Sequence, residues 1–185
     1  VLLGIAAALV AVPFTDSLLL LRKNFRRLPF LPAWMRPAAG GLVAGALAVV
    51  ALELLHTRGI TGGGYSTLER ALNGDLATFP MLLLCGLKVV ATSCCYASGG
   101  SGGIFAPSLF IGGMLGGAIG ELDGALFGHT EGVGSFALVG MGAVFAASIR
   151  APITSVLIIV EMTGGYSLIL PLMIANMIAY GLAHK

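Results

Sequence analysis

The sequence predicts an all-α membrane protein with tilted and discontinuous transmembrane helices. Of its 185 residues, 57% are hydrophobic and only 10% are charged, and the mean hydropathy is +0.99. Soluble domains usually have about a quarter of their residues charged. Long apolar stretches also alternate with shorter ones that have a proline near their start. The net charge of +2 is too small to indicate a nucleic-acid partner.

Three apolar stretches are long enough to cross a hydrocarbon core of about 30 Å. The first is interrupted by Pro13 and Asp16, and the third contains one charge, Lys88. We expect Lys88 to snorkel or to pair with protein groups, with a position in the ion pathway as the alternative. The three stretches are residues 1–21, 37–55 and 79–97.

Four later apolar stretches are shorter than the roughly 20 residues that a simple spanning helix needs. Pro107, Pro152 and Pro171 lie near the starts of three of them. Because proline interrupts a helix but is accepted in its first turn, we expect several of these helices to begin inside the bilayer and not to span it. The four stretches are residues 104–119, 135–149, 151–162 and 168–183.

A helix that begins inside a bilayer exposes backbone N–H groups that lipid cannot solvate. Such an end is tolerated only where it is buried in protein or faces a water-filled cavity. Its bare N–H donors and the positive end of the helix dipole bind an anion without a full positive charge. The short helices are therefore the candidates for an anion site.

The strongest candidate follows the glycine run of residues 99–103, which contains four glycines in five positions. Glycine allows a sharp turn and close approach to a ligand, and proline in a first turn loses no hydrogen bond. We therefore expect a helix to begin at Phe105, with the N–H groups of Ile104 and Phe105 facing an ion. Gly102, Gly103 and Pro107 would form the anion-site loop. The alternative is a glycine-rich turn that packs two membrane helices.

The same residues resemble a known family. The segment "GGIFAP" is similar to the Gly-x-Phe-x-Pro signature of the CLC family of chloride channels and chloride/proton antiporters, where the family has an anion-binding helix N-terminus. Downstream, "GSFALVGMGAVFAASIRAPITSVLIIVEMTGGYSLILPLMIAN" resembles the final membrane helices of that family. Upstream, "RPAAGGLVAGALAVVALELLH" and "GGGYSTL" resemble the matching part of its core. The resemblance covers nearly the whole chain.

The resemblance implies that residues 1–185 are the C-terminal half of a CLC-type transmembrane domain, the second of two inverted repeats, with the first half absent. The family's Gly-Ser-Gly-x-Pro serine, its Gly-x-Glu-Gly-Pro gating glutamate and its internal proton glutamate belong to that first half. Whether the protein is a channel or a proton-coupled antiporter therefore stays open. The sequence also leaves open the anion selectivity and the presence of cytoplasmic regulatory domains.

The resemblance further implies a site and partners. The chloride would be bound by the amides of Ile104 and Phe105 and by the hydroxyl of Tyr166, although from position alone Tyr166 is equally an interfacial aromatic. The transported ligand would be chloride or a similar small anion, with protons in an antiporter. The family also implies a multi-pass protein of the inner or plasma membrane and a homodimer, with residues 135–162 at its interface.

Five basic residues cluster between the first two long stretches, which places that connection in the cytoplasm by the positive-inside tendency. We expect them to contact phospholipid headgroups, with an electrostatic funnel for anions as the alternative. The residues are Arg22, Lys23, Arg26, Arg27 and Arg36.

The sequence predicts no enzyme, no cofactor and no metal site. HExxH and Walker motifs are missing, and the three cysteines have no histidine at metal-ligand spacing. Two alternatives to transport stay open. One is a structural or partner-binding membrane subunit, and the other is an intramembrane serine protease that uses Ser98, Ser101 and His129.

Overall fold

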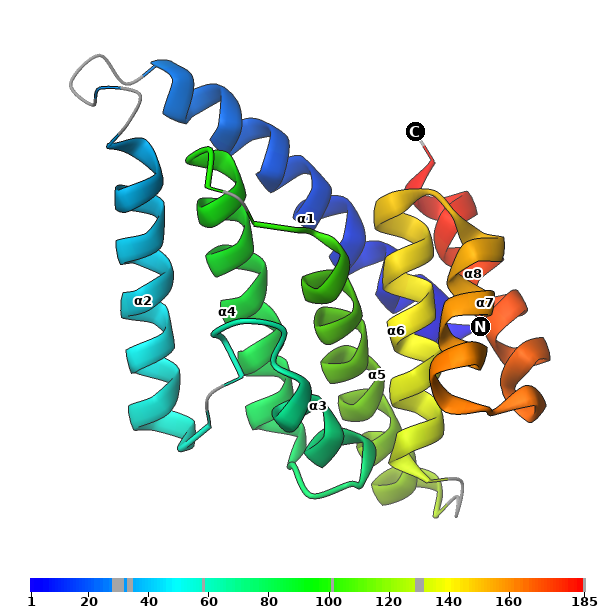
Figure 1. Ribbon diagram of the computed structural model, residues 1–185. Helices are drawn as coiled ribbons and strands as arrows, with labels where there is room; N and C mark the ends of the chain where they lie inside the picture. Colours follow the sequence, from blue (N-terminus) through cyan, green and yellow to red (C-terminus); the bar gives the residue numbers. More distant parts are fainter. Residues whose placement is uncertain (28–31, 33–34, 58, 101, 129–131, 185) are drawn as a thin grey trace.

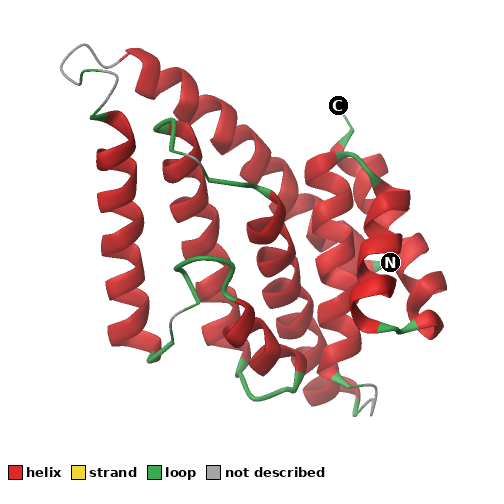
Figure 2. Cartoon of the chain, viewed as in Figure 1, coloured by secondary structure: helices red, strands yellow, loops and turns green. Residues whose placement is uncertain are grey.

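The computed structural model describes residues 1–27, 32, 35–57, 59–100, 102–128 and 132–184. Every regular element of these residues is helical (Figure 2). The elements are α1 (Leu2–Arg27), α2 (Arg36–Leu55), α3 (Tyr65–Leu72), α4 (Thr78–Ala97), α5 (Phe105–Phe127), α6 (Val133–Ile149), α7 (Pro152–Thr163), the 3-10 turn η1 (Tyr166–Leu168) and α8 (Ile169–Ala183). The all-α prediction is confirmed.

Helices α2, α4, α5 and α6 stand side by side in this order, and α7 and α8 lie on the outer side of α6 (Figure 1). The long helix α1 crosses the bundle obliquely and packs on α4, α6 and α8. The end of α1, the start of α2 and the end of α4 lie at the same end of the molecule (Figure 1). Figure 1 also shows that α5 begins below the end of α4, inside the bundle.

Within the described residues, five helical segments are long and apolar enough to cross a membrane, among them α1, α2 and α4 as predicted. The expected helix 104–119 was too short, because α5 continues to Phe127 and has 23 residues. It passes the polar Glu121, which accepts a 2.8 Å hydrogen bond from the Thr78 hydroxyl of α4. The segment from Tyr166 to Ala183 also reaches spanning length, whereas α6 and α7 stay short, with 17 and 12 residues.

Two breaks separate the last helices. Arg150 ends α6 in the left-handed conformation, with φ of 61°, and α7 then begins at Pro152. Gly164 ends α7 in the same way with φ of 65°, which glycine adopts without a Cβ penalty. The discontinuous helices that the prolines and glycines predict are therefore present.

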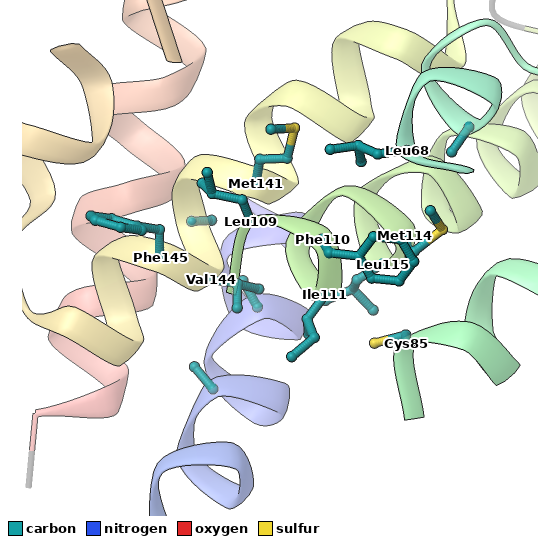
Figure 3. Packing of buried hydrophobic residues seen from close by; sticks show 14 of the residues in the cluster. Leu68, Cys85, Leu109, Phe110, Ile111, Met114, Leu115, Met141, Val144 and Phe145 are labelled. Carbon is teal, nitrogen blue, oxygen red and sulfur yellow. The ribbon is translucent and has the colours of Figure 1, made fainter. Parts of the chain in front are cut away.

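The core of the bundle is the contact between α5 and α6, where the two backbones approach closely. Added to Gly140 of α6, a Cβ would meet the Gly112 carbonyl oxygen and lie 2.8 Å from the Gly116 Cα of α5. Figure 3 shows the apolar side chains around this contact, including Phe110 and Met114 of α5 and Met141 of α6. Small residues at helix contacts are typical of membrane proteins, because they allow extensive backbone packing. This contact fixes the position of the α5 N-terminus.

Candidate functional site: the N-terminus of α5

The glycine run makes one left-handed turn. Gly99 has φ of 87°, and the Gly100 N–H donates to the Cys95 carbonyl over 3.3 Å. Gly102 and Gly103 have other conformations, and a Cβ at either position would meet nothing within 4 Å. Among the described glycines of the run, Gly99 is thus the one with a left-handed backbone. Gly102 and Gly103 instead leave open space in front of α5.

Helix α5 begins at Phe105, as predicted, with Ile104 as its N-cap. Its first intrahelical bond from the N-cap joins the Ser108 N–H to the Ile104 carbonyl over 3.0 Å. The N–H groups of Phe105 and Ala106 precede that of Ser108 in the chain. The helix offers them no carbonyl acceptor four residues earlier. Pro107 lacks an N–H at the next position, so no donor is lost there. The first turn therefore presents a small set of backbone donors.

This first turn lines a cavity with a volume of about 670 Å³. Gly102, Gly103, Phe105 and Pro107, four of the predicted site residues, contribute to its wall. The opposite wall comes from α2, from α4 and from the connection between α2 and α3, whose role the sequence did not reveal. Those residues are Gly41, Ala44, Gly45, Ile60, Thr61, Gly62, Gly63, Lys88, Ala91, Thr92, Cys95 and Tyr96.

Ile104 belongs to a neighbouring, smaller cavity of about 130 Å³, together with Tyr96 and Ser148. Tyr96 lines both cavities and so lies between them. The Phe105 ring packs edge-on against Phe145 of α6, with 5.2 Å between ring centroids. The α5 N-terminus is thus held by α6 on one side and opens to the larger cavity on the other.

Lys88 is the one charged residue in the described lining of the larger cavity, and it is 2% exposed. Its Nζ donates to the carbonyls of Gly59, Ile60 and Gly62 over 3.2, 3.0 and 2.7 Å. It also lies 4.9 Å from the centroid of the Phe110 ring. The expected pairing with protein groups is confirmed. Lys88 ties the α2–α3 connection to α4 and adds positive charge to the cavity wall.

Lys88→Met is expected to destabilise the protein by about 1–3 kcal/mol, the range for leaving buried acceptors unpaired. Methionine keeps much of the apolar stem but cannot donate to the three carbonyls that Lys88 contacts. Thermal unfolding of the purified protein in detergent measures this loss. A melting temperature equal to that of the wild type would show that the three hydrogen bonds contribute nothing.

Tyr166 does not line the cavity at the α5 N-terminus. It begins η1, is 70% exposed and is absent from the described lining of both cavities at the α5 N-terminus. Helix α7, with 12 residues and a length of about 18 Å, separates it from the Arg150 turn. Figure 1 shows the α7–α8 turn beyond α6, away from the start of α5. The tyrosine beside the α5 N-terminus is Tyr96, which the sequence did not single out.

The residues of the serine-protease alternative are not assembled in the described part of the chain. The Ser98 hydroxyl donates to the Cys95 carbonyl over 2.8 Å, within its own helical turn. Ser101 and His129 lie outside the described residues. Among the residues that are described, no group of three or more His, Cys, Asp or Glu side chains is positioned to bind a metal ion.

The fold and the site define an integral, multi-pass helical membrane protein in which a helix N-terminus opens to a cavity inside the bundle. The family described as voltage-gated chloride channels matches residues 1–184. The chain therefore belongs to this family, as the glycine and proline motifs predicted.

Individual relatives agree with this assignment. The chain is 40% identical over 163 residues to the H(+)/Cl(−) exchange transporter ClcA of Vibrio campbellii, covering 88% of this chain and 33% of the relative. It is 42% identical over 137 residues to ClcA of Yersinia pestis bv. Antiqua, and the match covers 73% of this chain and 28% of that relative. A solved structure of a slow cyanobacterial Cl−/H+ antiporter superposes with a TM-score of 0.83 and 31% identity, covering 98% of this chain and 42% of that one. The chain thus spans about a third of the length of these curated relatives.

Proposed function

We propose that this chain supplies half of an anion pathway in a membrane transporter that exchanges chloride for protons. The observation that carries the proposal is the first turn of α5, which opens to the 670 Å³ cavity inside the bundle. Support also comes from the relatives, whose names describe H(+)/Cl(−) exchange. Because the chain spans about a third of those relatives, the other ligands of the anion belong to residues outside it. We propose that residues 1–185 are the C-terminal half of the transmembrane domain.

In the proposed site, the backbone N–H groups of Ile104 and Phe105 donate to the chloride, and Gly102 and Gly103 leave room for it. A helix N-terminus contributes about 0.3–2 kcal/mol toward a nearby anion. Lys88 adds a favourable potential, but its three N–H donors are all used by three backbone carbonyls. Partial charges of this size bind chloride weakly enough for rapid release, as conduction and exchange require.

Reconstitution of the intact protein into liposomes tests this function. We expect chloride efflux that drives proton uptake against a gradient. Chloride flux without proton movement would favour a channel, and absence of any anion flux would favour the structural-subunit alternative. The bacterial relatives suggest the plasma membrane as the location.

Tyr166 provides a sharp test of which groups bind the anion. A hydroxyl that donates to a desolvated anion contributes about 1.5–3 kcal/mol, or roughly ten- to a hundred-fold in affinity. Because Tyr166 is exposed and lies apart from the cavity, we expect Tyr166→Phe to bind chloride as tightly as the wild type. Calorimetric titration of the intact protein measures this. A ten-fold weaker affinity would restore Tyr166 to the site.

We propose a homodimer, as the family resemblance implies, but with a narrower interface. Much of α6 is buried within the chain, so it offers little surface to a partner. By contrast, α7 and α8 expose apolar side chains, among them Ile153 at 76% and Leu170 at 71%. The interface is therefore expected on α7 and α8. Cysteine cross-linking at Leu157 in membranes tests this, because a dimer band requires the two copies to meet there.

A further inference from the structure

A second cavity, with a volume of about 380 Å³, lies between the end of α1, the start of α2 and the end of α4. Its described lining includes Arg22, Arg36, Tyr96, Ser98, Gly99 and Gly100, and the two arginines are the charged residues of that lining. The cavity is therefore basic, and it is large enough for a group of several atoms.

The guanidinium group of Arg22 is already oriented by the protein. Its central carbon lies 5.7 Å from the centroid of the Tyr96 ring. A guanidinium group that stacks on a ring uses its face, and the N–H groups along its edge stay available to an acceptor. Because arginine presents these donors in a planar fork, its natural ligands are carboxylate and phosphate groups.

The depth of the two arginines in the membrane identifies the ligand further. Arg22 lies in the last turn of the candidate span Leu2–Phe25, and Arg36 is the first residue of the span Arg36–Leu55. Both side chains therefore lie at the same membrane surface, where the phosphates of lipid headgroups are found.

Apolar side chains on the same two helices as the arginines fit the rest of a lipid. Leu19 and Leu20 of α1 are each 61% exposed, and Leu42 of α2 is 75% exposed. Acyl chains lie against such surfaces, whereas a free phosphate ion gains nothing from them. A phospholipid thus satisfies both the basic cavity and the exposed apolar surfaces of α1 and α2.

We propose that this cavity binds the phosphate group of an anionic phospholipid, with Arg22 and Arg36 as its donors. The site is distinct from the anion cavity at α5, although Tyr96 lines both. The bound headgroup would hold together the ends of α1, α2 and α4.

Thermal unfolding of the intact protein in a nonionic detergent tests the proposal. Dihexanoylphosphatidylglycerol is added as the probe, with dihexanoylphosphatidylcholine and sodium phosphate as parallel additions. We expect the phosphatidylglycerol alone to raise the melting temperature strongly at low concentration. The double variant Arg22→Gln, Arg36→Gln should need about a hundred-fold more of it or respond not at all, since each charge-assisted hydrogen bond contributes about a factor of ten.

Lys23→Gln is the matched control, because Lys23 is the next residue of α1, is exposed and does not line the cavity. It should respond as the wild type does. If the double variant does not fold, the single variant Arg22→Gln replaces it. Equal weakening in Lys23→Gln, an equal response to phosphatidylcholine, or a full response to sodium phosphate would each overturn the proposal of an anionic-lipid site.

Discussion

Gly140→Ala is expected to destabilise the protein strongly, by about 2–3 kcal/mol, in the upper part of the range for overpacking of a core. Alanine is a better helix former than glycine by about 1 kcal/mol, so propensity alone predicts a gain. The added Cβ, however, would meet backbone atoms of Gly112 and Gly116, which cannot rotate away as a side chain can. Helices α5 and α6 must then separate, and overpacking of this kind costs about 1–3 kcal/mol or more.

Gly181→Ala provides the control, because α8 leaves open space around that position. We expect it to keep or raise the melting temperature of the purified protein, whereas Gly140→Ala lowers it and reduces the yield of folded protein. Equal melting temperatures for the two variants would show that the α5–α6 backbone contact does not determine stability.

Gly103→Val is expected to abolish chloride transport while leaving the fold intact. A Cβ at Gly103 meets nothing within 4 Å, and the residue is not in the left-handed region, so valine is accepted without strain. The branched side chain would instead occupy the cavity in front of the α5 N-terminus, which Gly103 lines. An anion could no longer reach the donors of the first turn.

The control for this substitution is Gly86→Val in α4, another position with open space that does not line the cavity. Flux from liposomes and melting temperature are measured for both variants. Both should melt as the wild type does, and Gly86→Val alone should transport chloride. Wild-type flux in Gly103→Val would mean that the glycine run is only a packing turn.

Much of this fold follows from local sequence. Apolar length predicts α1, α2 and α4, and the residues after the glycine run predict the start of α5 at Phe105. The helix α3, with eight residues, was not predicted because it is too short and too polar for an apolar-length criterion. The continuation of α5 past Glu121 was also missed, because a hydrogen bond from Thr78, distant in sequence, makes that carboxylate acceptable there.

The candidate site depends on contacts that no local pattern reveals. From the sequence, Lys88 is a charge within an apolar span that has no evident partner. Its carbonyl partners lie 26 to 29 residues earlier in the chain, so no local pattern indicates them. Tyr96 gains its position between cavities only when α1, α4 and α5 pack together. For Tyr166, the glycines before it predict the helix break correctly, but a break does not determine which cavity a side chain reaches.

The most direct measurement for the proposed anion site is a crystal structure of the intact protein grown in bromide, with anomalous scattering used to locate the ion. Bromide replaces chloride and can be identified without assumptions about water. The proposed site predicts an anomalous peak in the cavity within hydrogen-bonding distance of the Phe105 N–H. A structure with bromide bound elsewhere, and no peak at the first turn of α5, would contradict it.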